Sequence, residues 1–102
     1  MLSVRTFKNH EFRLLDGLFS RAASVKALND RAIDVNLDEG ACYFTYYRAE
    51  NAAPYLQFVI RRVGPKTSMY ELYKEGKGRI TKSGLFERTY ERLVEEVEAL
   101  ME

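Results

Sequence analysis

The sequence predicts an α+β protein with two layers: an antiparallel meander of four to five strands, flanked in sequence by an N-terminal and a C-terminal helix that pack on one face of the sheet. Apolar residues recur with helical spacing near both ends of the chain, and apolar and polar residues alternate between them. The connections between the alternating segments are short, and parallel strands would need crossovers of a dozen or more residues. The 102 residues, 1–102, are expected to form a single domain.

Residues 10–29 have the pattern of the first, amphipathic helix. Asn9 is the expected N-cap, and Glu11 suits the positive end of the helix dipole in the first turn. Gly17 weakens a helix by about 1 kcal/mol relative to alanine, and we expect it to allow close approach of a strand or of the second helix. The apolar stripe of this helix consists of Leu15, Leu18, Phe19, Ala22 and Val25.

The middle of the chain is expected to form the sheet. Four segments alternate apolar with polar residues or are rich in β-branched and aromatic residues, and a fifth is shorter. Gly40 lies in the first hairpin connection, where a positive φ is needed. The segments are residues 33–37, 41–48, 55–63, 69–74 and, as the short fifth strand, 79–82.

Residues 85–101 form the clearest predicted helix, which Ser83 or Gly84 can cap. The stretch before it, YKEGKGRITKSGLFE, is rich in glycine and lysine and invites comparison with a phosphate-binding loop. Thr81 stands where such a loop needs its second glycine, and it also breaks the dinucleotide-binding glycine pattern. We therefore interpret residues 75–78 as a hairpin turn before a helix.

Composition excludes several classes of protein. The net charge is +1, so there is no global electrostatic reason to expect nucleic acid or a membrane as partner. The single cysteine, Cys42, cannot form an internal disulfide, and the first residues lack the apolar region of a signal peptide. No apolar run approaches the length of a membrane span. These features predict a cytoplasmic protein.

The candidates for chemistry are few. His10 is expected to be a solvated residue of the first helical turn, and Cys42 a buried strand residue. Asp34, Asn36 and Asp38 begin like a calcium-binding loop, but Thr45 stands where its final acid belongs. We therefore expect no catalytic residue, no metal and no cofactor.

The strand pattern places a different set of residues on each face. Leu56, Phe58 and Ile60 are expected to face the helices, as are Phe44, Tyr70 and Leu72. The opposite face should then be exposed, rich in tyrosine and low in charge at its centre, which suits a protein interface. Its expected contact residues are Tyr43, Tyr47, Tyr55, Val59, Arg61 and Tyr73.

Two functions are compatible with this face. The first is a noncatalytic protein-binding or homodimerisation module, whose partner is another protein or a second copy of the chain. The second is binding of single-stranded nucleic acid or RNA, with bases stacked on the tyrosines. Charge is uneven, since residues 48–82 carry a net +5 and residues 83–102 a net −4. The expected phosphate contacts are Arg48, Arg62, Lys66, Lys77, Arg79 and Lys82.

Overall fold

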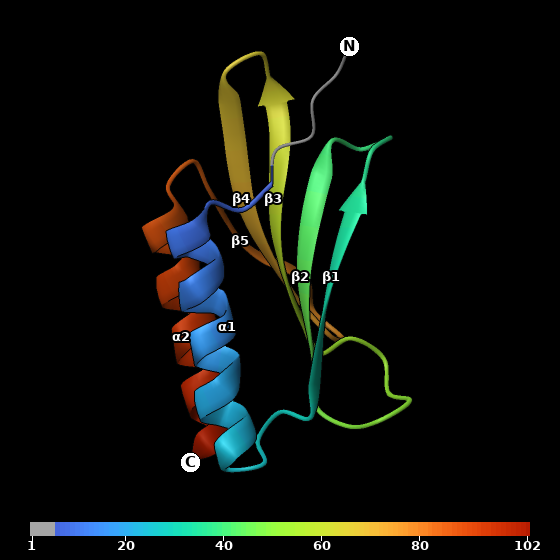
Figure 1. The fold of residues 1–102 in the computed structure, drawn as a ribbon, viewed down its shortest axis with the longest axis vertical. Coiled ribbons are helices and arrows are strands. Elements are labelled where there is room, and N and C mark those ends of the chain that lie inside the picture. Colours follow the sequence, from blue (N-terminus) through green and yellow to red (C-terminus); the bar gives the residue numbers. More distant parts are fainter. Residues whose placement is uncertain (1–5) are drawn as a thin grey trace.

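The computed structural model describes residues 6–102, which form two helices and one five-stranded sheet (Figure 1). The strands pair antiparallel in the order β1-β2-β3-β4-β5. This architecture confirms the predicted α+β class, the meander and the short fifth strand. In chain order the elements are α1 (Asn9–Ser24), β1 (Asp30–Asn36), β2 (Ala41–Tyr47), β3 (Leu56–Gly64), β4 (Thr67–Lys74), β5 (Gly78–Ser83) and α2 (Phe86–Met101).

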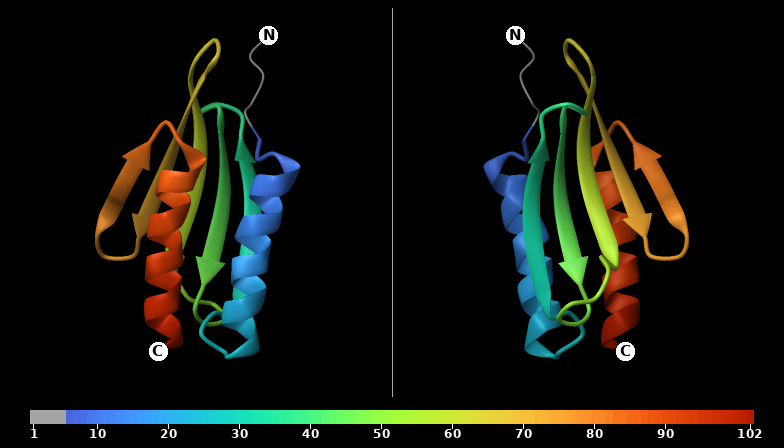
Figure 2. Two further views of the ribbon diagram at one scale, coloured as in Figure 1. Left: turned by 90° about the vertical axis from the view of Figure 1, so that its left-hand side faces the viewer. Right: turned by 90° about the vertical axis from the view of Figure 1, so that its right-hand side faces the viewer.

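Both helices lie on the same side of the sheet. Figure 2 shows α1 and α2 side by side in front of the strands in one view and behind them in the other. The opposite surface of the sheet, here called the outer face, is covered by no helix of residues 6–102. The connections between strands are hairpins, and Gly40, Gly76 and Gly78 adopt positive φ in two of them.

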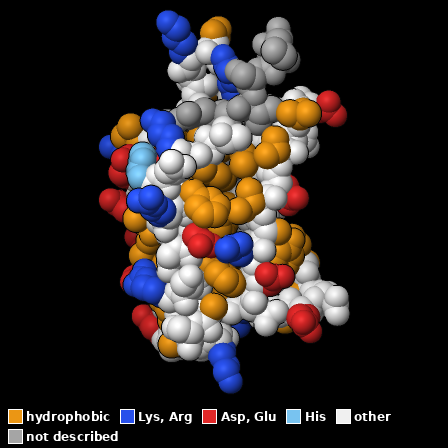
Figure 3. Space-filling model, viewed as in Figure 1, with side chains coloured by type: hydrophobic (Ala, Val, Ile, Leu, Met, Phe, Trp, Pro, Cys, Tyr) orange, Lys and Arg blue, Asp and Glu red, His pale blue; other side chains and the backbone are white. Residues whose placement is uncertain are grey.

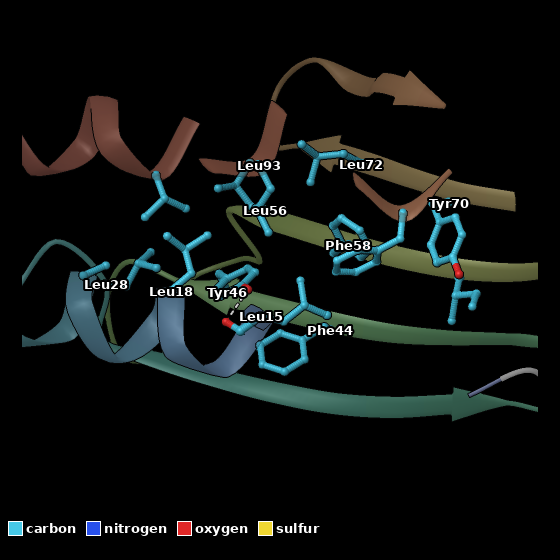
Figure 4. Packing of buried hydrophobic residues seen from close by; sticks show 14 of the residues in the cluster. Leu15, Leu18, Leu28, Phe44, Tyr46, Leu56, Phe58, Tyr70, Leu72 and Leu93 are labelled. Carbon is cyan, nitrogen blue, oxygen red and sulfur yellow. Dashed lines mark hydrogen bonds between the residues drawn. The ribbon is translucent and has the colours of Figure 1, made fainter. Parts of the chain in front are cut away.

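The core fills the space between the helices and the inner surface of the sheet (Figure 4). The residues predicted to face the helices are all buried there: Phe44, Leu56, Phe58, Ile60, Tyr70 and Leu72. They meet Leu15 and Leu18 of α1 and Leu93 and Val97 of α2. Buried apolar side chains of this size each contribute about 1.5–3 kcal/mol relative to exposure, so this layer contains the main stabilising contacts.

Three polar contacts fix the helices on the sheet. The buried Tyr46 hydroxyl donates to the Leu15 carbonyl at 2.8 Å (Figure 4). The Tyr70 hydroxyl donates to Glu11 Oε2 at 2.8 Å, while Glu11 Oε1 accepts the Lys8 backbone N–H at the start of α1. Lys74 Nζ of β4 lies 2.6 Å from Glu96 Oε1 of α2. A buried donor and acceptor that satisfy each other define how two elements dock.

The boundaries of α1 differ from the prediction. The N-cap is Lys8 rather than Asn9, and the helix ends at Ser24 instead of continuing to residue 29. Lys26 has a φ of 61°, and the N–H groups of Lys26 and Ala27 donate to the carbonyls of Ala23 and Ala22. This is a Schellman termination, normally signalled by glycine, and lysine takes the left-handed position here.

Gly17 also differs from the prediction. A Cβ at this position would meet no atom within 4 Å apart from the local helix. The glycine is therefore not needed for close packing against a strand or against α2. The N-terminus of α2 agrees more closely with expectation, because the Ser83 hydroxyl accepts the Leu85 backbone N–H at 3.0 Å, although the N-cap itself is Leu85.

Candidate interaction surface on the outer face

The strand register defines the rows of side chains on the outer face. Tyr43 of β2 lies opposite Val59 of β3, and Val59 lies opposite Glu71 of β4. The next row contains Thr45, Gln57 and Tyr73, in which Gln57 Nε2 donates to Thr45 Oγ1 at 3.3 Å. These rows place polar and aromatic side chains from three adjacent strands next to one another.

Glu71 is the centre of this surface. Its side chain is only 5% exposed although neither of the helices formed by residues 6–102 lies on this face. The carboxylate lies 3.3 Å from Arg61 Nε and 3.5 Å from Arg79 Nη1, and it accepts the Tyr73 hydroxyl at 2.9 Å. Charge-assisted bonds of this kind are stronger than neutral ones, and the buried carboxylate depends on them.

Glu39 of the β1–β2 turn extends the same network. The Tyr43 hydroxyl donates to Glu39 Oε1, and Arg61 Nη1 lies 3.9 Å from that oxygen. The turn itself is held by Asn36, whose side chain exchanges two hydrogen bonds of 3.1 Å with Glu39. The outer-face cluster is thus a connected set of six residues: Glu39, Tyr43, Arg61, Glu71, Tyr73 and Arg79.

The surroundings of the outer-face cluster keep the hydroxyls of Tyr43 and Tyr73 protonated and the guanidinium of Arg61 charged. Burial, followed by the bond to Glu39, raises the pKa of Tyr43. Burial, followed by the bond to Glu71, raises the pKa of Tyr73. Burial opposes the charge of Arg61, but its bond with Tyr43 and the charge of Glu71 outweigh it and raise the pKa of Arg61. Near neutral pH the hydroxyls of Tyr43 and Tyr73 therefore remain hydrogen-bond donors, and Arg61 remains a cation.

The predicted contact residues divide into three groups. Tyr43, Arg61 and Tyr73 come together in the outer-face cluster, and Tyr47 lies on the same face, partly exposed. Val59 is on this face by register, but it is 0% exposed because longer side chains flank it. The prediction that Val59 contributes contact area is therefore wrong for this surface.

Tyr55 lies at the margin of the outer face rather than among the other tyrosines. It precedes β3, and its ring packs against the core cluster. Arg48 Cζ lies 5.2 Å from the ring centroid and Lys74 Nζ 5.9 Å from it. Lys74 also pairs with Glu96 of α2, so its contact with the Tyr55 ring places that ring toward the helix side of the sheet.

The predicted phosphate contacts do not form one patch. Arg62 and Lys66 lie at the β3–β4 hairpin, where Arg62 Nε donates to the Gly64 carbonyl at 3.1 Å. Arg48, Lys77 and Arg79 lie near the opposite end of β4, which is eight residues or about 26 Å long. Lys82 is exposed on β5, opposite Glu71.

A shallow hollow adjoins the outer-face cluster on the β1 side. Its volume is about 560 Å³, and Tyr43 belongs both to its wall and to the cluster. The lining is mixed, with acids, amides and two exposed aliphatic side chains. The residues that form it are Asp34, Val35, Asn36, Leu37, Asp38, Tyr43 and Gln57.

The other chemical candidates lie elsewhere. Cys42 is buried on the inner side of β2, where burial raises the pKa of its thiol. His10 is exposed at the start of α1, with its ring 6.4 Å from that of Phe86. Within residues 6–102 no group of three histidine, cysteine or acidic residues could hold a metal ion.

The prediction that the centre of this face is low in charge is wrong, because Glu71 lies there with Arg61 and Arg79. The sequence pattern did not indicate the role of Glu71 or of Glu39. The available signal was a single acid within the otherwise apolar and aromatic segment MYELY, at a position that alternation directs outward. The arginines that pair with Glu71 lie on two other strands. Only the register, which depends on the turns, shows that they meet.

Comparison with known proteins finds no matching family model, no matching curated protein and no matching solved structure. Neither helix of residues 6–102 is long and apolar enough to cross a membrane.

Proposed function

We propose that this chain is a noncatalytic protein-binding module whose outer face receives a partner protein, with a second copy stacked back to back as one form of that partner. The observation that supports the proposal most directly is the outer-face cluster. Tyrosine and arginine side chains, the types enriched at interface hot spots, are held in place there by buried Glu71 on an uncovered sheet.

Preorganisation supports the proposal. Ordering a long side chain on binding costs about 0.5–1.5 kcal/mol, and Arg61, Tyr43 and Tyr73 are already ordered by the network. Tyr47 adds a partly exposed ring, and the adjoining hollow of about 560 Å³ can accept side chains of a partner. A neutral cluster of alternating charges suits a protein surface with complementary polar groups.

Binding of single-stranded nucleic acid through the same face remains the alternative proposal. It rests on the tyrosines as stacking platforms and on the nearby basic residues. Two observations favour the protein partner instead. Arg61 and Arg79 are already paired with Glu71, and a phosphate would meet that carboxylate as well. The basic residues also lie at opposite ends of β4.

Site-specific photo-crosslinking tests the proposal in cells that produce the full chain. Benzoylphenylalanine is introduced at Tyr47 or Lys82 on the outer face, and at the exposed Glu91 of α2 as a matched control. We expect a discrete protein adduct from positions 47 and 82 and none from position 91. An adduct with twice the mass of the chain from position 82, on the strand farthest from β1, identifies the back-to-back homodimer. Adducts from position 91 alone, or from no position, would contradict the proposal.

Titration with a fluorescent single-stranded oligonucleotide tests the alternative. Phosphate contacts strengthen as salt falls, so the measurement is made at about 50 mM and at about 200 mM salt. The protein-binding proposal expects no saturable binding up to about 100 µM protein at the lower salt. Tight binding that weakens steeply with salt, and that is lost when Tyr47 is replaced by serine, would favour nucleic acid.

A further inference from the structure

The two edge strands of the sheet differ in how they are protected. Exposed edges present unpaired backbone groups, and proteins commonly protect them with bulges, lysines or short strands. β5 has a register irregularity opposite Leu72 and Tyr73 and carries Arg79 and Lys82. β1 pairs with β2 through seven consecutive residues with no irregularity, and the segment Asp30–Asn36 contains neither lysine nor proline. Its other edge pairs with no strand of residues 6–102.

An apolar row runs along this unprotected edge. Ile33 and Val35 lie opposite the buried Phe44 and Cys42, so they belong to the inner, core-facing surface of the sheet. They are nevertheless 41% and 51% exposed, and Leu37 after them is 71% exposed. Figure 3, which faces the β1 edge, shows hydrophobic side chains gathered between the helix layer and the strands. Within residues 6–102, no element covers the core at the β1 edge.

We propose that a second copy of this chain covers the edge by antiparallel pairing of β1 with β1, which joins the two sheets into one of ten strands. The twofold axis passes between the Ile33 residues of the two copies, so that these two residues face each other and Arg31 of one copy faces Val35 of the other. Both copies then present their helices on the same side, and both outer faces stay uncovered. The pairing uses the β1 edge and not the outer-face cluster, although the β1 residues Asp34, Val35 and Asn36 also line the hollow beside that cluster.

The positions of the aspartates in β1 favour this register and support a second copy as the strand that pairs with β1. Symmetric pairing about Ile33 is the only one that uses all seven residues of β1, and it sets Asp34 opposite Ala32 and Asp30 opposite Asn36. Moving the axis to Ala32 sets Asp30 opposite Asp34, and moving it to Asp34 sets that aspartate opposite itself. Like charges directly opposite destabilise a strand pair, so both neighbouring registers are disfavoured.

The one cation on the apolar row does not oppose the pairing. Arg31 already forms an ion pair with Asp16 of α1, and its Cζ lies 5.6 Å from the centroid of the Phe19 ring. Phe12 and Phe19 are partly buried against the core on the same side of α1. In the paired sheet the stem of Arg31 and these rings line the seam between the two α1 helices, where the apolar row is removed from water.

Light scattering coupled to size-exclusion chromatography tests the pairing. The wild-type chain is expected to elute with twice its monomer mass at about 100 µM. Ile33→Lys sets two lysines opposite each other at the axis, and we expect it to be a folded monomer by circular dichroism and scattering. Val63→Lys changes a residue of β3 that is 51% exposed, against 41% for Ile33, and should leave the dimer unchanged.

Single cysteines in a Cys42→Ser background test the register. Opposite Cα atoms in an antiparallel pair lie about 4.5–5.5 Å apart, within disulfide range, whereas diagonal ones lie about 7–8 Å apart. Ile33→Cys should therefore form an intermolecular disulfide on mild oxidation, and Ala32→Cys and Asp34→Cys should not. This test also works if Ile33→Lys fails to fold.

Three results would overturn the inference. The wild-type chain could be monomeric at about 100 µM. A dimer could persist in folded Ile33→Lys, which would place the contact on another surface. The crosslink could form at position 32 or 34 and not at 33. The outer-face crosslinks are measured at positions outside β1, so this pairing and the proposed function can fail separately.

Discussion

At the scale of single residues, Glu71 determines the arrangement of the outer face. Its carboxylate pairs with both Arg61 and Arg79 and accepts the Tyr73 hydroxyl, all on a surface that no helix of residues 6–102 covers. Without this carboxylate, Arg61, Arg79 and the Tyr73 hydroxyl would each lack an acceptor. The geometry of the proposed interface therefore depends on one side chain that itself contributes almost no exposed area.

Replacement of Glu71 by glutamine tests this role. The amide keeps the volume but leaves two arginines without their anion, so we expect the free energy of unfolding to fall by about 1–3 kcal/mol. Urea unfolding followed by circular dichroism measures the change. Glu91→Gln, at an exposed position of α2, should change it by less than about 0.5 kcal/mol. Equal effects of the two substitutions would show that the cluster does not stabilise the fold.

The burial of Tyr46 leads to a prediction about the stability of the fold at alkaline pH. Burial raises the pKa of its hydroxyl well above the ordinary value near 10. Below about pH 10 both the folded and the unfolded chain keep the proton, so this contribution to stability is complete. Above that pH the unfolded chain ionises first, and stability falls as the pH rises toward the folded pKa.

Tyr46→Phe should therefore have two effects. At pH 7 the loss of the bond to the Leu15 carbonyl lowers the free energy of unfolding by about 1 kcal/mol. Above about pH 10 the decline of stability with pH becomes shallower than in the wild type. Urea unfolding at a series of pH values measures both effects. If the free energy of unfolding of Tyr46→Phe declined with pH as steeply as that of the wild type in the alkaline range, the role assigned to burial would be contradicted.

At the scale of elements, replacement by alanine should have opposite effects on the free energy of unfolding at two glycines with different backbone conformations. Gly17 lies within α1 with open space around its Cβ position, so Gly17→Ala should raise the free energy of unfolding by about 0.5–1 kcal/mol. Gly76 has a φ of 77° in the β4–β5 turn, so Gly76→Ala should lower it by about 1 kcal/mol. Thermal unfolding of both variants measures the difference, and a loss of stability in Gly17→Ala would show a packing role for this glycine.

The elements themselves could largely be predicted from local patterns. The period of two in β2 and β3 and the apolar stripe of α2 are strong because each element has one buried face. The end of α1 could not be predicted, since Lys26 takes a left-handed conformation that sequence normally assigns to glycine. Tertiary contacts of Ala22 and Leu28 with the core outweigh that local preference.

At the scale of the whole molecule, the side of the sheet that stays open was predicted, but its centre was not. Alternation placed Tyr43, Tyr47, Arg61 and Tyr73 on one face. Alternation cannot tell that Val59 is covered by its neighbours or that Glu71 pairs with arginines from two strands. Those facts depend on register and side-chain length, which connect residues far apart in the chain.

The open outer face is the central claim, and a soluble paramagnetic probe tests it most directly. Such a probe broadens NMR signals of accessible groups, and the tyrosines supply matched reporters on both sides of the sheet. We predict strong broadening of the ring signals of Tyr43, Tyr47 and Tyr73 and little for the buried Tyr46 and Tyr70. Protection of the three outer-face rings to the level of Tyr46, in the isolated monomer, would contradict the claim.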